Sequence, residues 1–157
     1  MQTIVGYLLA VFIFQPINLL VHEYGHAFFV KIFGGHISKI EIGTGSPIVN
    51  IGHLRINKVF FLSGFCGYVD DANFCDNRFK LSLIAMGGVI FNTLTIIFLI
   101  LIKYSTAHFH FLDGYFFMAT GLLILSALAP VKYSNGLDSD GLWLINIWAN
   151  KSSNHNN

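Results

Sequence analysis

The sequence predicts a mainly α-helical, polytopic membrane protein with three transmembrane helices and a short surface or membrane-associated β region between the first and second helices. Of its 157 residues, 54% are hydrophobic and only 11% are charged, and the mean hydropathy is +0.63. Soluble domains carry roughly twice that share of charged residues, about 25%. The net charge of +1 argues against nucleic acid as a partner. The lipid bilayer is therefore the expected environment.

The first predicted transmembrane helix covers about residues 3–32, a length that spans a bilayer with some tilt. Pro16 lies inside it and is expected to kink it, because proline removes one backbone hydrogen bond. The helix is expected to end at the glycine pair Gly34 and Gly35.

The β region is predicted over residues 36–70, where five glycines and one proline separate short alternating runs. Residues 38–42 and 54–60 are expected to be strands, because alternation of apolar and polar residues is typical of a half-buried strand. We expect two to four short strands at the membrane surface or dipping into it. Any dipping part must be covered by protein or water, since open sheet edges cannot face lipid.

Two further transmembrane helices are predicted at about residues 79–102 and 114–131. A polar loop follows, and then a short apolar helix at residues 140–150. Residues 1–150 are expected to form one domain, and the polar tail, residues 151–157, is expected to be disordered.

Eight of the nine lysines and arginines follow the first or third predicted span, and only Lys103 lies on the other side of the membrane. Because positive residues favour the cytoplasmic side, the β region and the C-terminus are predicted to be cytoplasmic and the N-terminus to be outside. The two cysteines, Cys66 and Cys75, would then face a reducing compartment. They are predicted to be free thiols, with a disulfide as the less favoured alternative.

A His-Glu-x-x-His pattern formed by His22, Glu23 and His26 lies inside the first apolar run. Ionisable side chains are costly in a bilayer, so their presence there indicates a function. Positions i and i+4 share one helix face, so both imidazoles can bind one zinc ion, and the glutamate can act as general base. The alternative is a chance match on a buried helix, with both histidines hydrogen-bonded to nearby carbonyls.

A catalytic zinc site needs a third protein ligand, and the three aspartates that follow residue 76 are candidates. Asp113 begins the third span at the membrane face opposite the histidines, about 20 Å or more away. Asp138 and Asp140 follow that span and lie on the same side as the histidines. Asp140 is favoured because it opens an apolar helix, which it can cap. Asp138 stays open as the alternative, and either residue could instead be a solvated loop carboxylate.

The chain resembles the site-2 protease family of intramembrane zinc metalloproteases in four segments that occur in the family's order. Residues 21–27 (VHEYGHA) resemble the zinc-binding helix, and residues 34–70 resemble the surface strand region, with residues 65–69 (FCGYV) similar to the turn that ends it. Residues 88–92 (GVIFN) resemble the family's Gly-Pro-x-x-Asn, although Val89 stands in place of proline. Residues 128–130 and 139–141 resemble the segment that ends in the Asp-Gly zinc ligand, without the customary residues just before the aspartate.

The resemblance implies a zinc metalloendopeptidase that cleaves peptide bonds in or near transmembrane segments of membrane proteins. It implies one Zn2+ per chain held by His22, His26 and Asp140, with Glu23 as the catalytic base. Asn92 would contact the substrate backbone or steady the site, and the alternative for it is a simple hydrogen bond between helices. The expected location is the cell membrane of a bacterium, with the active site toward the cytoplasm.

Two other functions are compatible with the sequence. The chain could be a catalytically silent membrane protein of the same fold that binds a partner membrane peptide, although the intact Glu23 argues against this. It could also be a metal-handling membrane protein, but further ligands inside the membrane are scarce. The sequence leaves the substrate, the pathway and the oligomeric state open.

Overall fold

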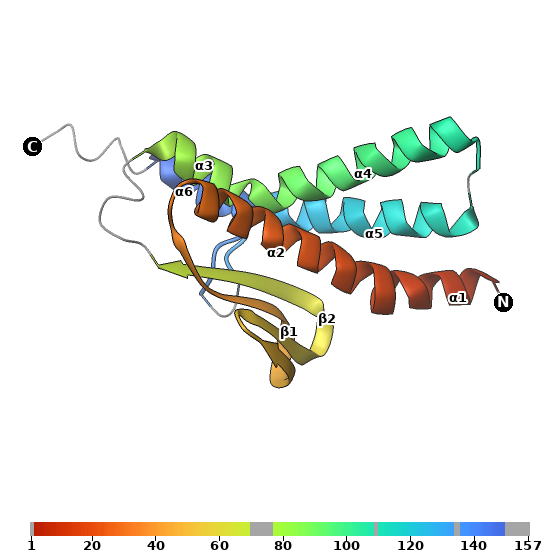
Figure 1. The fold of residues 1–157 in the computed structure, drawn as a ribbon, viewed down its shortest axis with the longest axis horizontal. Coiled ribbons are helices and arrows are strands. Elements are labelled where there is room, and N and C mark those ends of the chain that lie inside the picture. The colour runs from red at the N-terminus through yellow and green to blue at the C-terminus, as the bar shows by residue number, and fades with distance from the viewer. Residues whose placement is uncertain (1, 70–76, 109, 134–135, 150–157) are drawn as a thin grey trace, which may run out of the picture.

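The computed structural model of the chain describes residues 2–69, 77–108, 110–133 and 136–149. Three long helical runs lie side by side, and a two-stranded sheet covers one side of the first run (Figure 1). These three runs are long and apolar enough to cross a membrane. The predicted class, a mainly helical protein with three candidate spans and a small sheet between the first two, is confirmed. The predicted tail, residues 151–157, and Cys75 lie outside the described residues.

The first helical run consists of α1 (Gln2–Leu9), the π-helix η1 (Ala10–Phe14) and α2 (Gln15–Ile32). A π-helical turn ends two residues before Pro16, in the region where a kink is expected. Proline has no N–H for the carbonyl four residues earlier, and a wider turn accommodates that missing bond. Leu9 and Gln15, which flank the turn, both keep right-handed helical dihedral angles, so the chain stays helical through this region.

The predicted helix over residues 79–102 is interrupted and extends further than expected. The structure has α3 (Arg78–Ala85), a break at Met86, and then α4 (Gly87–Thr106). The break coincides with a very close approach of α4 to α2: a methyl group placed on Gly87 would overlap the backbone of Gly25. Glycine is required at both positions of this crossing, because only residues without side chains allow two backbones to approach so closely.

The third span, α5 (Phe111–Leu128), begins and ends three residues earlier than predicted, because its ends are set locally. His110 and Asp113 form a reciprocal capping box at its start. At its end, Ala129 is extended, as expected for a residue that precedes a proline. The last helix, α6 (Asp140–Ala149), matches the predicted short helix to within a residue.

The sheet consists of β1 (His36–Ile51) and β2 (Leu54–Val69), which pair in antiparallel fashion. Both strands are longer than predicted because several bulges bend them instead of ending them. As a result Ile40 pairs with both Leu54 and Cys66, so the beginning and the end of β2 flank the same segment of β1. Gly43 and Gly45, with φ of 82° and 93°, supply left-handed conformations within this bent region.

The buried core lies where α2, β1, α3 and α5 meet, and the outer faces of the spans are apolar and exposed. The core cluster includes Leu19, Val30, Ile40, Ile84 and Leu123. Large exposed apolar side chains on α4 and α5 include Leu94, Phe98, Leu101, Leu122 and Leu125. Such a surface suits contact with lipid, where apolar side chains need no protein cover.

Candidate metal centre and active site

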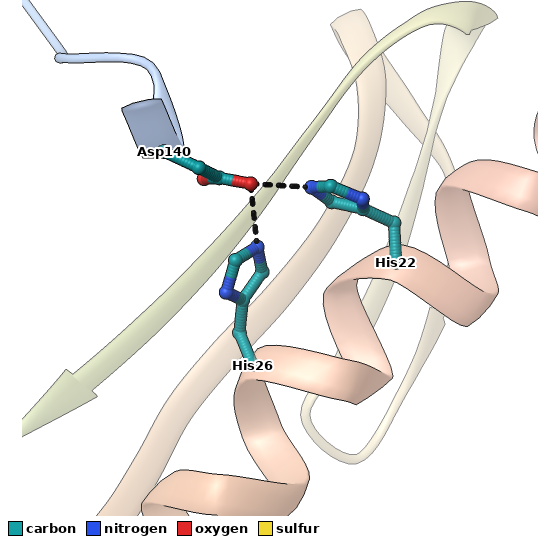
Figure 2. Close-up of side chains that lie close together, drawn as sticks. All are labelled: His22, His26 and Asp140. Carbon is teal, nitrogen blue, oxygen red and sulfur yellow. Dashed lines mark ion pairs between the residues drawn. The ribbon is translucent and has the colours of Figure 1, made fainter. Parts of the chain in front are cut away.

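The three residues of the His-Glu-x-x-His pattern are buried in α2, next to the sheet. His22, Glu23 and His26 are only 5%, 5% and 8% exposed. The two imidazoles lie one helical turn apart on the same face, with ring centroids separated by 4.8 Å (Figure 2). The helix therefore presents both rings to one point, as the i, i+4 spacing predicts.

Asp140, the first residue of α6, meets both imidazoles. Its Oδ2 atom lies 3.0 Å from Nε2 of His22 and 3.5 Å from Nε2 of His26 (Figure 2). Asp138 takes no part in this cluster, and its carboxylate accepts a hydrogen bond from Asn146 at 2.8 Å. Asp113 lies at the opposite end of the helices, where it forms a 2.9 Å ion pair with Lys103. The structure thus places Asp140, the favoured aspartate, beside both histidines and gives Asp138 and Asp113 other partners.

The geometry of this cluster fits a metal ion. Oδ2 of Asp140 is buried and has no hydrogen-bond partner among the described residues, despite its short distances to both rings. Two atoms that bind one tetrahedral zinc ion at 2.0–2.1 Å lie about 3.3 Å apart. The distances of 3.0 Å and 3.5 Å bracket that value. His22, His26 and Asp140 are therefore a possible metal-binding group.

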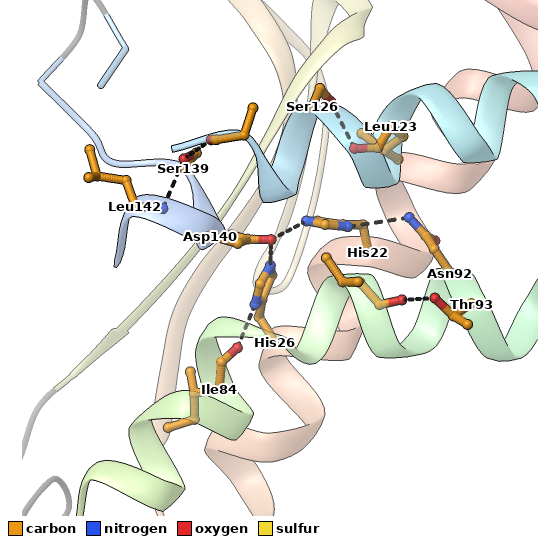
Figure 3. Close-up of polar contacts among 12 residues, drawn as sticks. His22, His26, Ile84, Asn92, Thr93, Leu123, Ser126, Ser139, Asp140 and Leu142 are labelled. Atoms are coloured by element: carbon orange, nitrogen blue, oxygen red, sulfur yellow. Dashed lines mark hydrogen bonds and ion pairs between the residues drawn. The ribbon is translucent and has the colours of Figure 1, made fainter. Parts of the chain in front are cut away.

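Ser139 and Gly141 hold Asp140 in place. The Ser139 hydroxyl accepts the N–H of Leu142 at 3.2 Å, so it caps α6, and it also donates to the carbonyl of Ala129 at 2.5 Å (Figure 3). The expectation that Asp140 caps its own helix is therefore wrong, because Ser139 takes that role and leaves the carboxylate free to face the histidines. Gly141 sits against the carbonyl of Leu128, where a methyl group would overlap it.

Asp140 and Cys66 both lie in this region, but their surroundings shift the pKa of the two side chains in opposite directions. Burial raises the pKa of the Asp140 carboxyl, but the neighbouring imidazoles lower it more, to about 2. Asp140 is therefore ionised, the form that binds metals. Burial raises the pKa of the Cys66 thiol to about 12, and the nearby Glu23 adds to this effect. Because only the thiolate is a good metal ligand, Cys66 is not suited to join the site.

The cluster opens onto a cavity of about 1140 Å³. Its walls come from α2, β1, β2, the end of α5, the segment between α5 and α6, and α6 itself. Strand β2 passes directly over Glu23, because a methyl group placed on Gly64 would overlap the Glu23 carboxylate. Gly64 thus lets the sheet approach the glutamate while the cavity leaves room for a larger molecule beside the cluster.

Two groups contact the imidazoles at Nδ1: Asn92, which the sequence had singled out, and the carbonyl of Ile84, which it had not. Nδ1 of His26 lies 2.7 Å from the carbonyl oxygen of Ile84, at the end of α3 (Figure 3). Nδ1 of His22 lies 3.3 Å from the amide Nδ2 of Asn92, in α4. Asn92 is fully buried and does not line the cavity, so its position supports the steadying role over contact with substrate. No local pattern marks a backbone carbonyl such as that of Ile84.

Gly88 offers a direct test of how closely α4 supports His22. A methyl group placed on Gly88 would overlap the His22 imidazole. We expect Gly88→Ala to displace the ring and to weaken zinc binding by about 10- to 100-fold, the range typical when a metal-binding histidine loses its orientation. Zinc competition with a chromophoric chelator measures this. Gly121→Ala in α5 is the matched control, since its added methyl group would meet no described atom within 4 Å. Equal affinities for the two variants would contradict the prediction.

Two comparisons with known proteins match most of this chain. The family model for peptidase family M50 matches residues 8–140, a range that includes His22, His26 and Asp140. The uncharacterized membrane protein YwmF of Bacillus subtilis (strain 168) is 33% identical over 144 residues. That alignment covers 91% of this chain and 89% of YwmF.

Proposed function

Because this chain belongs to peptidase family M50, whose members are zinc metalloproteases, we propose that it is a zinc-dependent intramembrane endopeptidase. The observation that carries the proposal is the convergence of His22, His26 and Asp140 beside Glu23, at the wall of a large cavity next to apolar helices. His22, His26 and Asp140 would hold one zinc ion, and the cavity would admit part of a membrane-protein substrate.

Glu23 supplies the acid–base chemistry in this proposal. When bound, zinc would polarise the scissile carbonyl and lower the pKa of a water molecule. Glu23 would take a proton from the attacking water and pass it to the leaving amine. Its placement supports this role, because it neighbours His22 in α2 and is absent from the ligand group. Gly64 packs against the Glu23 carboxylate, and Glu23 lines the cavity.

The substrate would be a transmembrane segment that has locally unwound, because an intact helix hides its carbonyls in hydrogen bonds. An extended peptide can add to the edge of a sheet. Residues 62–68 of β2 line the cavity and would offer such an edge. Gly64 and Cys66 pair with Ile42 and Ile40 of β1 on one side of this segment, and the peptide would add on the other side.

The location of the site in the membrane follows from the distribution of charge. The chain is an integral, multi-pass membrane protein. Lys31 lies in the last turn of α2, beyond His26, and eight of the nine basic residues follow the first or the third span. Positive residues favour the cytoplasmic side, so we propose that the site opens toward the cytoplasm of a bacterial cell.

Cleavage of a single-span peptide by the purified protein in liposomes tests the proposed function. We expect zinc-dependent cuts inside or near the span, located by mass spectrometry, and loss of cleavage on zinc chelation. A water-soluble peptide with the same target sequence but no span serves as the control and should be cut poorly. If the zinc-loaded protein binds the single-span peptide and never cuts it, the chain is instead the silent peptide-binding protein.

A further inference from the structure

The interrupted helix α3–α4 meets both imidazoles from the side opposite Asp140. Each ring points its Nε2 at Asp140 and its Nδ1 at this helix (Figure 3). Nδ1 of His26 faces the carbonyl oxygen of Ile84, two residues before the break at Met86. Nδ1 of His22 faces the side-chain amide of Asn92 in the following helix. The part of the helix before the break therefore contacts His26, and the part after the break contacts His22.

A neutral imidazole carries one proton, and its position decides which nitrogen can bind a metal. The carbonyl of Ile84 can only accept a hydrogen bond, so the 2.7 Å contact requires the proton of His26 to be on Nδ1. Nε2 of His26 is then unprotonated and faces Asp140. The backbone of the interrupted helix thus fixes the form of His26 that can bind a metal through Nε2.

His22 needs an acceptor at Nδ1 to reach the same form. If Nδ2 of Asn92 donated to Nδ1, the ring proton would lie on Nε2, facing Asp140 and blocking metal binding there. A half-turn of the amide instead presents Oδ1 to Nδ1. Oδ1 of Asn92 is buried and has no hydrogen-bond partner among the described residues. The half-turn gives Oδ1 a partner in the Nδ1–H of His22 and moves Nδ2 to the position that Oδ1 now occupies.

We propose that Asn92 is a positioning residue that accepts the Nδ1–H of His22 through Oδ1 and so keeps Nε2 unprotonated for metal binding. Together with the carbonyl of Ile84, it makes the two parts of the interrupted helix a support that selects the same tautomer in both histidines. This inference rests on the zinc site of the proposed function. It assigns Asn92 no contact with substrate and no part in proton transfer.

Two substitutions of Asn92 separate this role from simple packing. Asn92→Asp keeps an acceptor at Nδ1 of His22, whereas Asn92→Leu keeps a similar volume and removes it. We expect Asn92→Leu to lower zinc affinity by about 10- to 100-fold and Asn92→Asp to stay within about threefold of the parent. Thr120→Val is the control for loss of a buried polar group, because Thr120 is fully buried and its hydroxyl donates to the Phe116 carbonyl of its own helix. It should bind zinc like the parent.

The tautomer itself is the second readout, and it needs neither zinc nor catalysis. In zinc-free Asp140→Ala protein with 15N-labelled histidine, at mildly alkaline pH, the His22 proton should be on Nδ1, because the carboxylate that lies 3.0 Å from Nε2 is then absent; the signals are assigned by comparison with protein that also carries His22→Ala. When Asn92→Leu is added, the proton should shift toward Nε2. A His22 proton on Nε2 in Asp140→Ala with Asn92 intact, or equal zinc affinities for the Leu and Asp variants, would overturn the inference. Because the first spectrum needs no substitution at Asn92, an Asn92 variant that fails to fold leaves the test intact. A parent that binds zinc but cleaves nothing would contradict the proposed function and not this inference.

Discussion

Replacing Glu23 with glutamine is expected to leave zinc bound and to reduce cleavage by at least about a hundredfold, the usual scale for loss of a general base. Glutamine has nearly the same shape as glutamate, so it should fit under Gly64, where the Glu23 carboxylate is packed. It cannot accept the proton of the attacking water. The metal-binding group does not include Glu23, so zinc content should not change. Cleavage rate and zinc content are measured on the same preparation.

The same substitution at Glu41 is the matched control. Glu41 also lines the cavity, but it lies in β1, where it pairs with Lys39 at 2.8 Å, and it is remote from the metal-binding group. Glu41→Gln should retain most of the cleavage activity. If Glu23→Gln cleaved at a rate close to that of the parent, Glu23 would not be the base.

Replacing Asp140 with alanine should lower zinc affinity by more than the roughly 10- to 100-fold that changes in supporting residues typically cause. Asp140 is the one carboxylate in the group with His22 and His26, and catalytic zinc sites use three protein ligands. Its removal would leave two imidazoles. A competition assay with a chelator of known affinity measures the loss, and cleavage should fall with it.

The other two aspartates provide the comparison. Asp113→Ala should keep zinc and activity, because Asp113 pairs with Lys103 at the far end of the spans. Asp138→Ala should have a smaller effect than Asp140→Ala, since Asp138 bonds Asn146 beside α6 and not the histidines. Loss of zinc in Asp113→Ala would contradict the arrangement of the three spans.

The sequence predicted the parts of this protein that depend on local spacing and on the order of the spans. The i, i+4 spacing was enough to place His22 and His26 on one face, because helical geometry is local. The choice of Asp140 as third ligand required one further step, the count of membrane crossings, and that count excluded Asp113. The structure brings Asp140 to both histidines, whereas the role of this group in binding zinc stays a prediction.

Features that depend on contacts between distant segments could not be predicted in this way. The break at Met86 lies in an apolar run without proline, and it coincides with the approach of Gly87 to Gly25. The carbonyl of Ile84 has no sequence signal, since every residue carries one. Bulges in the sheet arise from pairing between β1 and β2, so alternation alone gave strands that were too short.

Zinc content of the purified protein tests the central claim most directly. The parent should carry about one zinc ion per chain, as a site with three protein ligands requires. The double variant His22→Ala/His26→Ala, prepared identically, should carry almost none, because it loses two of the three ligands that converge in the structure. A full equivalent of zinc in that double variant would place the metal elsewhere and contradict the account.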